Sequence, residues 1–272
     1  MPELPEVERA ARILRTAITG AVVDRVQLLH PALRRRVSQK TLRALRGATV
    51  SAVERRGKHQ LIHLTDGRIV HVHFRMNGDW HIDHTSDPLP RFARAVLSFV
   101  GGVRVVLDDS RALSSLEVHT AAMPPELGLG PEPDDTTVAS LRSSLARRRI
   151  PIKVALLDQR VIAGLGNIYA SEALWRARID PRLASSSLGD AQLSRLLAGI
   201  RAIIARANGT RYFGARRGRF DVYDRLGHPC RRCRTPIARV VQSGRSTYFC
   251  PYCQRPPSRS TGGAVAAPSR TA

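Results

Sequence analysis

The sequence predicts an α+β protein with more than one domain. Short runs with strand-like alternation fill the first half, helical periodicity dominates residues 134–207, and all four cysteines lie between residues 230 and 253. A chain of 272 residues with 43% apolar content is long enough to form two domains with hydrophobic cores. We therefore expect an N-terminal antiparallel β-sandwich with flanking helices, a helical domain and a small C-terminal β-hairpin module.

The first predicted element is a helix over residues 5–16. Pro5 fits the first helical position, and Glu6 and Glu8 complement the positive end of the helix dipole. The apolar positions have helical spacing: Val7, Ala10, Ala11 and Leu14.

The start of the chain also permits chemistry. Removal of Met1 would leave Pro2 with a free secondary amine, followed at once by the carboxylate of Glu3. Such an amine is a potential nucleophile. Ordinary helix-start chemistry also explains the proline and the acidic residues, and on local grounds it is the favoured interpretation.

Short strands are predicted for the rest of the first half. Val70, Val72 and Phe74 alternate with polar residues, which is the period of a half-buried strand, and Asp66-Gly67 is a hairpin signal. The expected strands are residues 21–29, 48–53, 60–64, 69–74, 93–99 and 103–107.

Six of the nine histidines lie between residues 59 and 84. The spacing of His71 and His73 suits a metal ion, but no acidic residue or cysteine nearby in the sequence completes a site. We expect no metal there.

The second half begins at a turn-rich linker, residues 128–133. Apolar periodicity then predicts helices over residues 134–146, 151–158, 167–176 and 189–207. Residues 256–272 are rich in Pro, Ser, Gly and Ala and are expected to be disordered.

Charge points to a polyanionic partner. The 44 basic and 22 acidic residues give a net charge of +22, and residues 206–272 contain 14 Arg but no Lys or Glu. Guanidinium groups bind phosphate in bidentate fashion, although a solvated surface or an RNA-binding tail would give part of the same signal. Only Lys40, Lys58 and Lys153 are lysines, and a retained lysine can mark a proton-transfer site.

The chain is expected to be cytoplasmic and not membrane-bound. It has no run of 18 apolar residues, and its N-terminus is acidic where a signal peptide would be basic.

The cysteines predict one structural zinc ion. Cys230, Cys233, Cys250 and Cys253 form the pattern C-x2-C-x16-C-x2-C, which supplies four thiolates for a closed tetrahedral site. Residues 237–241 and 245–249 between the two pairs can form a β-hairpin. Disulfides are disfavoured in a cytosolic protein.

Together these features resemble the family of formamidopyrimidine-DNA glycosylase and endonuclease VIII. Six segments within about residues 2–255 carry the resemblance: PELPEVE at 2–8, Gly57-Lys58, HFRMNG at 73–78, LGLGPEP at 127–133, GLGNIYASE at 164–172 and the four-cysteine finger. The N-terminal motif is closer to the formamidopyrimidine branch.

The resemblance implies a division of the chain and a set of partners. It implies a catalytic β-sandwich over residues 2–130, a helix-two-turns-helix domain over 131–225 and a zinc finger over 226–255. Damaged double-stranded DNA would lie between the halves, bound by a monomer.

The resemblance also implies a reaction. The enzyme would flip an oxidised base out of the duplex, attack the sugar through Pro2 as a Schiff base, and cleave the strand by β,δ-elimination. Glu3 would be the acid/base group, and Glu6 would orient the terminus. Lys58 would act near the lesion and its flanking phosphate, and Lys153 would be a second lysine of the site with a weaker role. The implied DNA-binding residues are His73, Met76, Arg111, Leu113, Asn167 and Arg245.

Two departures leave the lesion open. Leu113 stands where the family usually has Phe in the loop that fills the gap left by the flipped base, and the run 208–220 is shorter than the lid of purine-specific members. Oxidised purines, oxidised pyrimidines as in the endonuclease VIII branch, and damage binding without cleavage all remain possible.

Overall fold

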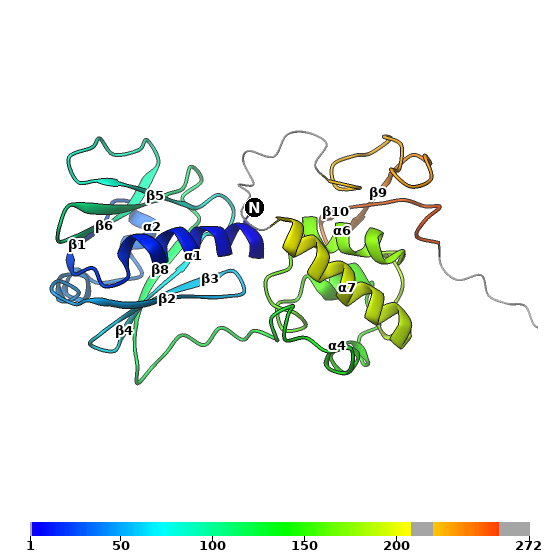
Figure 1. Cartoon of the computed structure of the whole chain (residues 1–272), viewed down its shortest axis with the longest axis horizontal. Helices are drawn as coiled ribbons and strands as arrows, with labels where there is room; N and C mark the ends of the chain where they lie inside the picture. Colours follow the sequence, from blue (N-terminus) through cyan, green and yellow to red (C-terminus); the bar gives the residue numbers. More distant parts are fainter. Residues whose placement is uncertain (1, 208–219, 256–272) are drawn as a thin grey trace, which may run out of the picture.

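The fold is built from an N-terminal half of strands and a C-terminal half of helices that meet at the start of α1 (Figure 1). The computed structural model describes residues 2–207 and 220–255. Met1, the expected lid run 208–220 except for Phe220, and the expected disordered tail 256–272 lie outside the described residues.

Two antiparallel four-stranded sheets form the N-terminal half. One has the order β1-β6-β7-β5 and the other the order β2-β3-β4-β8. The first sheet contains β1 (Val23–Leu28), β6 (Ala93–Phe99), β7 (Val103–Asp108) and β5 (Asp79–His84). The second contains β2 (Val50–Arg56), β3 (His59–Leu64), β4 (Arg68–His73) and β8 (Ser115–Thr120).

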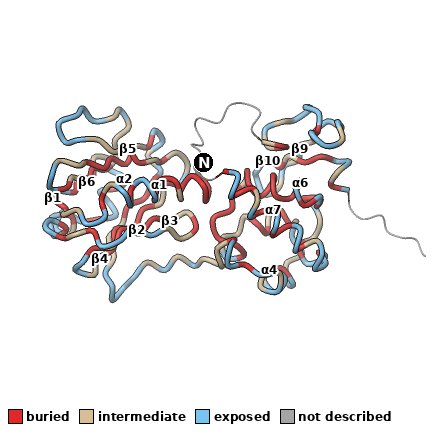
Figure 2. Tube along the Cα trace, in the orientation of Figure 1, coloured by how far each residue is buried: buried red, intermediate tan, exposed pale blue. Residues whose placement is uncertain are grey.

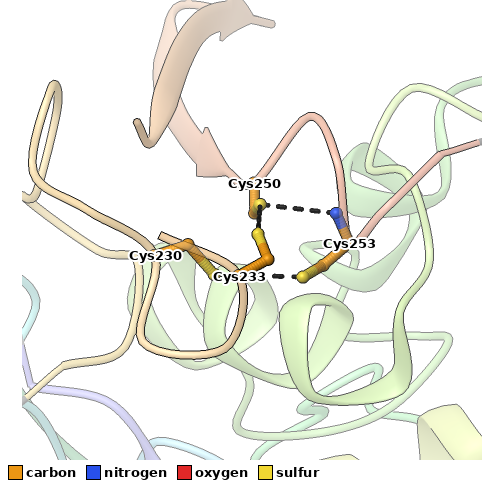
Figure 3. Close-up of side chains that lie close together, drawn as sticks. All are labelled: Cys230, Cys233, Cys250 and Cys253. Atoms are coloured by element: carbon orange, nitrogen blue, oxygen red, sulfur yellow. Dashed lines mark hydrogen bonds between the residues drawn. The ribbon is translucent and has the colours of Figure 1, made fainter. Parts of the chain in front are cut away.

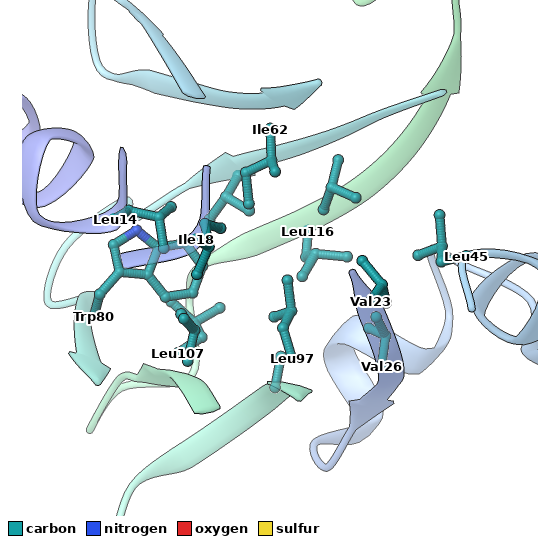
Figure 4. Packing of buried hydrophobic residues seen from close by; sticks show 14 of the residues in the cluster. Leu14, Ile18, Val23, Val26, Leu45, Ile62, Trp80, Leu97, Leu107 and Leu116 are labelled. Carbon is teal, nitrogen blue, oxygen red and sulfur yellow. The ribbon is translucent and has the colours of Figure 1, made fainter. Parts of the chain in front are cut away.

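A single hydrophobic core fills the space between the two sheets and the helix α1 (Leu4–Ile18). Leu14 and Ile18 of α1 point toward Ile62, Leu107 and other buried side chains of the strands (Figure 4). The short helices α2 (Pro31–Arg34) and α3 (Gln39–Ala44) flank β1.

The C-terminal half has its own core. Buried residues occur in both halves (Figure 2), and those of the helical half form a separate hydrophobic cluster that also includes Leu4. The elements are α4 (Val138–Leu145), α5 (Ile152–Leu156), α6 (Asn167–Ala177), the 3-10 helix η1 (Ser185–Ser187) and α7 (Asp190–Ala207).

A two-stranded hairpin, β9 (Ala238–Gln242) and β10 (Arg245–Phe249), follows the helices. Ser243 and Gly244 form its turn with φ of 47° and 71°, as a tight two-residue hairpin requires. This architecture of sandwich, helical half and C-terminal hairpin is the expected fold class.

The expected helices and strands are present, but two strands and the short α-helices α2 and α3 were missed, and the helices expected over 134–146 and 151–158 are shortened. β5 and β8 were not predicted, because β5 buries little besides Trp80 and the polar residues of β8 concealed the alternation of Leu116 and Val118. The helix expected over 134–146 begins only at Val138, because Thr137 caps it and accepts a hydrogen bond from the Ser140 N–H.

No helix within residues 2–207 and 220–255 is long and apolar enough to cross a membrane.

Candidate active site

The N-terminus of α1 is inserted between the two halves of the molecule (Figure 1). Pro2 and Glu3 are buried, and the Leu4 N–H donates a 3.1 Å hydrogen bond to the carbonyl of Gly164 in the loop before α6. The first residues of the chain are therefore attached to a segment about 160 positions away.

The carboxylate of Glu3 lies at the N-terminus of α6. It accepts hydrogen bonds from the backbone N–H groups of Gly166 (2.7 Å), Ile168 (2.9 Å) and Tyr169 (3.3 Å). Unpaired N–H groups and the helix dipole make this end of a helix a favourable place for a negative charge. Burial nevertheless raises the pKa of Glu3 above its ordinary value, although the charge of Lys58 and the N–H donors oppose the rise.

Glu6 holds the backbone next to Pro2. One carboxylate oxygen accepts a 2.9 Å hydrogen bond from the Glu3 N–H, and the other accepts a 2.6 Å bond from the Tyr169 hydroxyl. Burial raises the pKa of Glu6, and the Tyr169 hydroxyl opposes that rise. The first turn of α1 is thus held to α6 by two acidic side chains.

Lys58 extends from the turn between β2 and β3 toward the same loop. Its ammonium donates a 2.7 Å hydrogen bond to the Leu165 carbonyl, one residue before the Gly166 N–H that binds Glu3. Burial lowers the pKa of Lys58, and Arg245 lowers it further, while Glu3 opposes the change. A carboxyl with a raised pKa and an amine with a lowered one suit proton transfer near neutral pH.

Lys153 and Asn167 connect the helical half to the hairpin. The fully buried Lys153 ammonium donates to the side-chain oxygen of Asn167, whose amide donates a 3.0 Å bond to the Ser246 carbonyl in β10. Burial lowers the pKa of Lys153 to about 8, and Arg245 contributes to the shift. Both polar atoms of the Asn167 side chain therefore have a partner within the protein.

Five of the expected site residues line one cleft. Its walls come from the N-terminal sheets, the segment after α5 and the tip of the hairpin. The expected residues that line it are Lys58, His73, Met76, Leu113 and Arg245. Arg111 is exposed on the same loop as Leu113 but does not line this cavity.

Two loops present the apolar side chains of this cleft. Met76 follows β4, and Leu113, which is 46% exposed, precedes β8. The buried carboxylate of Asp109 holds the second loop by accepting hydrogen bonds from the N–H groups of Arg111, Leu113 and Ser114 at 2.8–2.9 Å. An exposed leucine held on a rigid loop can be inserted between bases.

His73 is a neutral hydrogen-bond donor toward the cleft. Its Nδ1 accepts a 2.9 Å bond from the Arg75 N–H, so the proton of the neutral ring is on Nε2. Burial lowers the pKa of His73 to about 3, and the neighbouring His59, Arg75 and Lys58 add to the shift.

The four cysteines converge at the base of the hairpin (Figure 3). The sulfurs of Cys230 and Cys253 are 3.9 Å apart and those of Cys233 and Cys250 are 3.4 Å apart. Tetrahedral coordination with zinc–sulfur bonds of about 2.3 Å requires sulfur separations of about 3.8 Å. The cluster fits one structural zinc ion, as the spacing predicted.

Comparison with known sequences assigns the family. The profile of the "Formamidopyrimidine-DNA glycosylase N-terminal domain" matches residues 1–116, that of the "Formamidopyrimidine-DNA glycosylase H2TH domain" matches residues 127–212, and the "Zinc finger found in FPG and IleRS" matches residues 227–256. The chain belongs to the formamidopyrimidine-DNA glycosylase family. The expected resemblance is thus confirmed.

Individual members of this glycosylase family align with nearly the whole chain. A formamidopyrimidine-DNA glycosylase of Paracoccus denitrificans is 39% identical over 281 residues, and one of Acidiphilium cryptum is 40% identical over 278 residues. Each alignment covers 94% of this chain and 100% of the relative.

Solved structures of the family have the same fold. The Lactococcus lactis glycosylase bound to DNA with an AP site superposes with a TM-score of 0.84 at 28% identity, covering 93% of this chain and 100% of that one. MutM in complex with DNA containing carbocyclic 8-oxo-G superposes with a TM-score of 0.86 at 27% identity, covering 94% and 100%.

Sequence reasoning missed the residues that hold the glycosylase site together. The Gln159 side chain bonds the Leu165 carbonyl and the Gly164 N–H, and so shapes the loop that receives Glu3. Glu132 accepts a 2.7 Å bond from the Gly57 N–H beside Lys58. Glu132 lies in the LGLGPEP segment, but no local pattern reveals its contact with Gly57, which is 75 residues away in the sequence.

Proposed function

We propose that this chain is a bifunctional DNA glycosylase and abasic-site lyase of base excision repair. Its substrates would be oxidised purines, of the formamidopyrimidine or 8-oxoguanine type, in double-stranded DNA. The observation that carries the proposal is the convergence of the Pro2-Glu3 segment, the N-terminus of α6 and Lys58 between the two halves of the molecule. A protein that only binds damaged DNA, without cleaving it, would not need a terminal amine at the site between the two halves.

Pro2 is the proposed nucleophile once Met1 has been removed. Its nitrogen lone pair attacks C1′ of a flipped nucleotide, a C–N bond forms, and the bond to the damaged base breaks as the base leaves with a proton. The sugar ring then opens to an iminium, with Glu3 giving the proton that O4′ takes up. The buried Glu3 has a raised pKa, so it can hold that proton near neutral pH.

The iminium then drives strand cleavage. It acidifies C2′, and loss of that proton expels the 3′ phosphate; a second elimination expels the 5′ phosphate. Lys58 is the proposed proton-transfer and phosphate group, and Lys153 the weaker second one, since burial lowers the pKa of both.

The remaining expected residues are proposed to hold DNA. Arg245 at the hairpin tip would grip the phosphates flanking the lesion, with His73 donating from Nε2. Met76, Arg111 and Leu113 would fill the gap left by the flipped base. Because both polar atoms of the Asn167 side chain have a partner, we propose that Asn167 positions Lys153 and the hairpin, and that the second N–H of its amide donates to a phosphate.

Borohydride trapping tests the nucleophile. Reduction of the reacting complex with abasic-site DNA should yield a stable covalent adduct through Pro2, and Pro2→Gly should reduce its yield by more than about tenfold. A form that retains Met1 should also fail, because its proline nitrogen is an amide. Trapping of both forms at the parent level would show that Pro2 is not the nucleophile.

A panel of defined duplexes tests the lesion. Duplexes with formamidopyrimidine or 8-oxoguanine should be cleaved faster than one with thymine glycol. The names of the relatives and the 8-oxo-G complex support this order. Preferred cleavage of thymine glycol would favour the endonuclease VIII alternative, and tight binding without cleavage would favour a non-catalytic damage-binding protein.

We further propose that the chain acts as a monomer in the cytoplasm and divides functionally at about residues 130, 225 and 255. The proposed reaction invokes no residue of a second subunit. Sedimentation of the free protein at micromolar concentration would test it.

A further inference from the structure

Three potential metal ligands share the outer face of the sheet β2-β3-β4-β8. His71 of β4 is directly opposite Glu117 of β8, and His119 follows two residues later on the same face of β8. One ring nitrogen of each histidine and one oxygen of Glu117 all lie within 4.8 Å of one another. This corrects our expectation that His71 has no acidic partner, because the partner lies across the sheet.

One ring nitrogen of each histidine is shielded from solvent and makes no hydrogen bond. Nδ1 of His71 and Nε2 of His119 are both buried and unpaired, which is unusual for polar atoms inside a protein. The Nε2 of His119 is 3.5 Å from a carboxylate oxygen of Glu117 without a hydrogen bond between them. Tetrahedral zinc with bonds of about 2.1 Å places its ligand atoms about 3.4 Å apart.

The neighbouring side chains orient the three ligands. Nδ1 of His59 and Nε2 of His71 are 2.8 Å apart and share a hydrogen bond, which leaves Nδ1 of His71 available. Arg36 donates a 2.7 Å hydrogen bond to one oxygen of Glu117 and leaves the second oxygen available. Metal sites in proteins typically have such second partners, which fix the ring and the carboxylate in place.

We propose that His71, Glu117 and His119 bind a divalent transition-metal ion of the zinc class. Two imidazoles and one carboxylate favour zinc or cobalt over magnesium or calcium, and they leave a fourth position for water. The site is separate from the four cysteines and is not needed for the proposed Schiff-base chemistry. The ring of His59 separates this site from the cleft. His59 stacks on His71 on one side and lines the cleft beside His73 on the other.

Zinc titration of the full chain tests the proposal. Protein whose four cysteines already hold zinc should take up a second equivalent by calorimetry and metal analysis. His119→Ala and Glu117→Ala should weaken that second binding by more than about tenfold, whereas His63→Ala should not. His63 is the matched control, because it lies on the neighbouring strand β3 and pairs with Glu54 instead.

Cobalt provides a measurement that needs no variant. Co²⁺ added to the zinc-loaded protein should give weak ligand-field bands without the intense sulfur-to-metal charge transfer of a thiolate site. Absence of a second equivalent in the parent would overturn the proposal, as would a second equivalent retained in both variants or thiolate bands on addition of cobalt. A urea-unfolding transition like that of the parent in each variant shows that the sandwich is folded, and retention of the first zinc equivalent shows that the finger is intact.

Discussion

Glu3 reaches its place on α6 only because residue 166 has no side chain. A Cβ at position 166 would lie 2.4 Å from Cδ of Glu3, and one at position 164 would lie 2.4 Å from the side chain of Leu4. Both glycines belong to the GLGN segment, so the N-terminal motif and this distant loop are adapted to each other. The close approach of the two segments requires glycine at both positions.

Gly166→Ala should therefore abolish most activity while leaving the fold intact. The new methyl group would displace the Glu3 carboxylate by about 1 Å, and a displacement of that size can cost about 100-fold in rate. Single-turnover trapping with abasic-site DNA measures the loss. Gly189→Ala is the control, since its Cβ would meet nothing nearer than Gln192 at 4.0 Å. Trapping of the Gly166→Ala variant at the parent rate would contradict the assigned arrangement.

Lys153 should make stability depend on pH. Its pKa is about 8 in the folded protein and ordinarily 10.5, so the unfolded chain binds more protons between these values. The free energy of unfolding therefore gains a contribution that rises with pH from about 8 to 10.5. In Lys153→Met, the increase between pH 7 and pH 9.5 should be smaller by about 1–2 kcal/mol than in the parent.

Urea unfolding at the two pH values measures this difference. Lys40→Met serves as the control, because it removes a lysine that is exposed on α3. An unchanged pH dependence in Lys153→Met would show that the buried ammonium keeps its ordinary pKa.

At the scale of elements, the loop before β8 depends on one buried carboxylate. Asp109 is 1% exposed and binds three backbone N–H groups and the Ser114 hydroxyl, while Ala112 in the same loop has a φ of 53°. A non-glycine residue in the left-handed region is strained and needs such support. The position of Leu113 over the cleft therefore depends on Asp109.

Asp109→Asn should loosen this loop. In the variant, an amide NH2 replaces one carboxylate oxygen and cannot accept the hydrogen bonds that this oxygen receives from backbone N–H groups. Leaving those groups without an acceptor should lower the free energy of unfolding by about 1–3 kcal/mol. Binding of lesion DNA, measured by fluorescence anisotropy, should weaken as well. Asp87→Asn is the control, since Asp87 accepts one bond from the exposed His84 N–H. Equal losses in the two variants would argue against a special role for the loop.

The elements that were predicted well are those with strong local signals. α1 has a proline in its first turn and a helical stripe of apolar residues, and the β9–β10 hairpin has its Ser243-Gly244 turn. β5 was missed because Trp80 is its only fully buried residue, so its burial does not alternate. Its pairing with β7 depends on contacts that local periodicity does not reveal.

At the scale of the whole molecule, the hairpin is packed against the helical half. Arg232 lies over the ring of Trp175 at 3.8 Å and donates to its carbonyl, and the Gln254 amide donates to the Ile179 carbonyl. Asn167 adds its bond to Ser246. The zinc cluster thus supports a surface that reaches the proposed catalytic lysines.

Loss of zinc should therefore abolish DNA cleavage without unfolding the sandwich. In Cys250→Ser or chelator-treated protein, we expect DNA affinity to fall by more than about tenfold and trapping to fall with it, because Arg245 is no longer held at the cleft. Metal analysis, anisotropy and urea unfolding measure the three quantities. Full trapping by zinc-free protein would show that the hairpin is dispensable.

The sequence by itself determined the chemistry and the kinds of elements. The terminal proline, the few lysines and the four cysteines are chemical features that require no coordinates, and turn residues and apolar periods act over a few positions. Only the tertiary structure decided which groups meet: Glu3 with the α6 N-terminus, Lys153 with Asn167, and His71 with Glu117 and His119. These contacts join segments that are distant in sequence. Burial, which no local pattern records, raises the pKa of Glu3 and lowers that of Lys153.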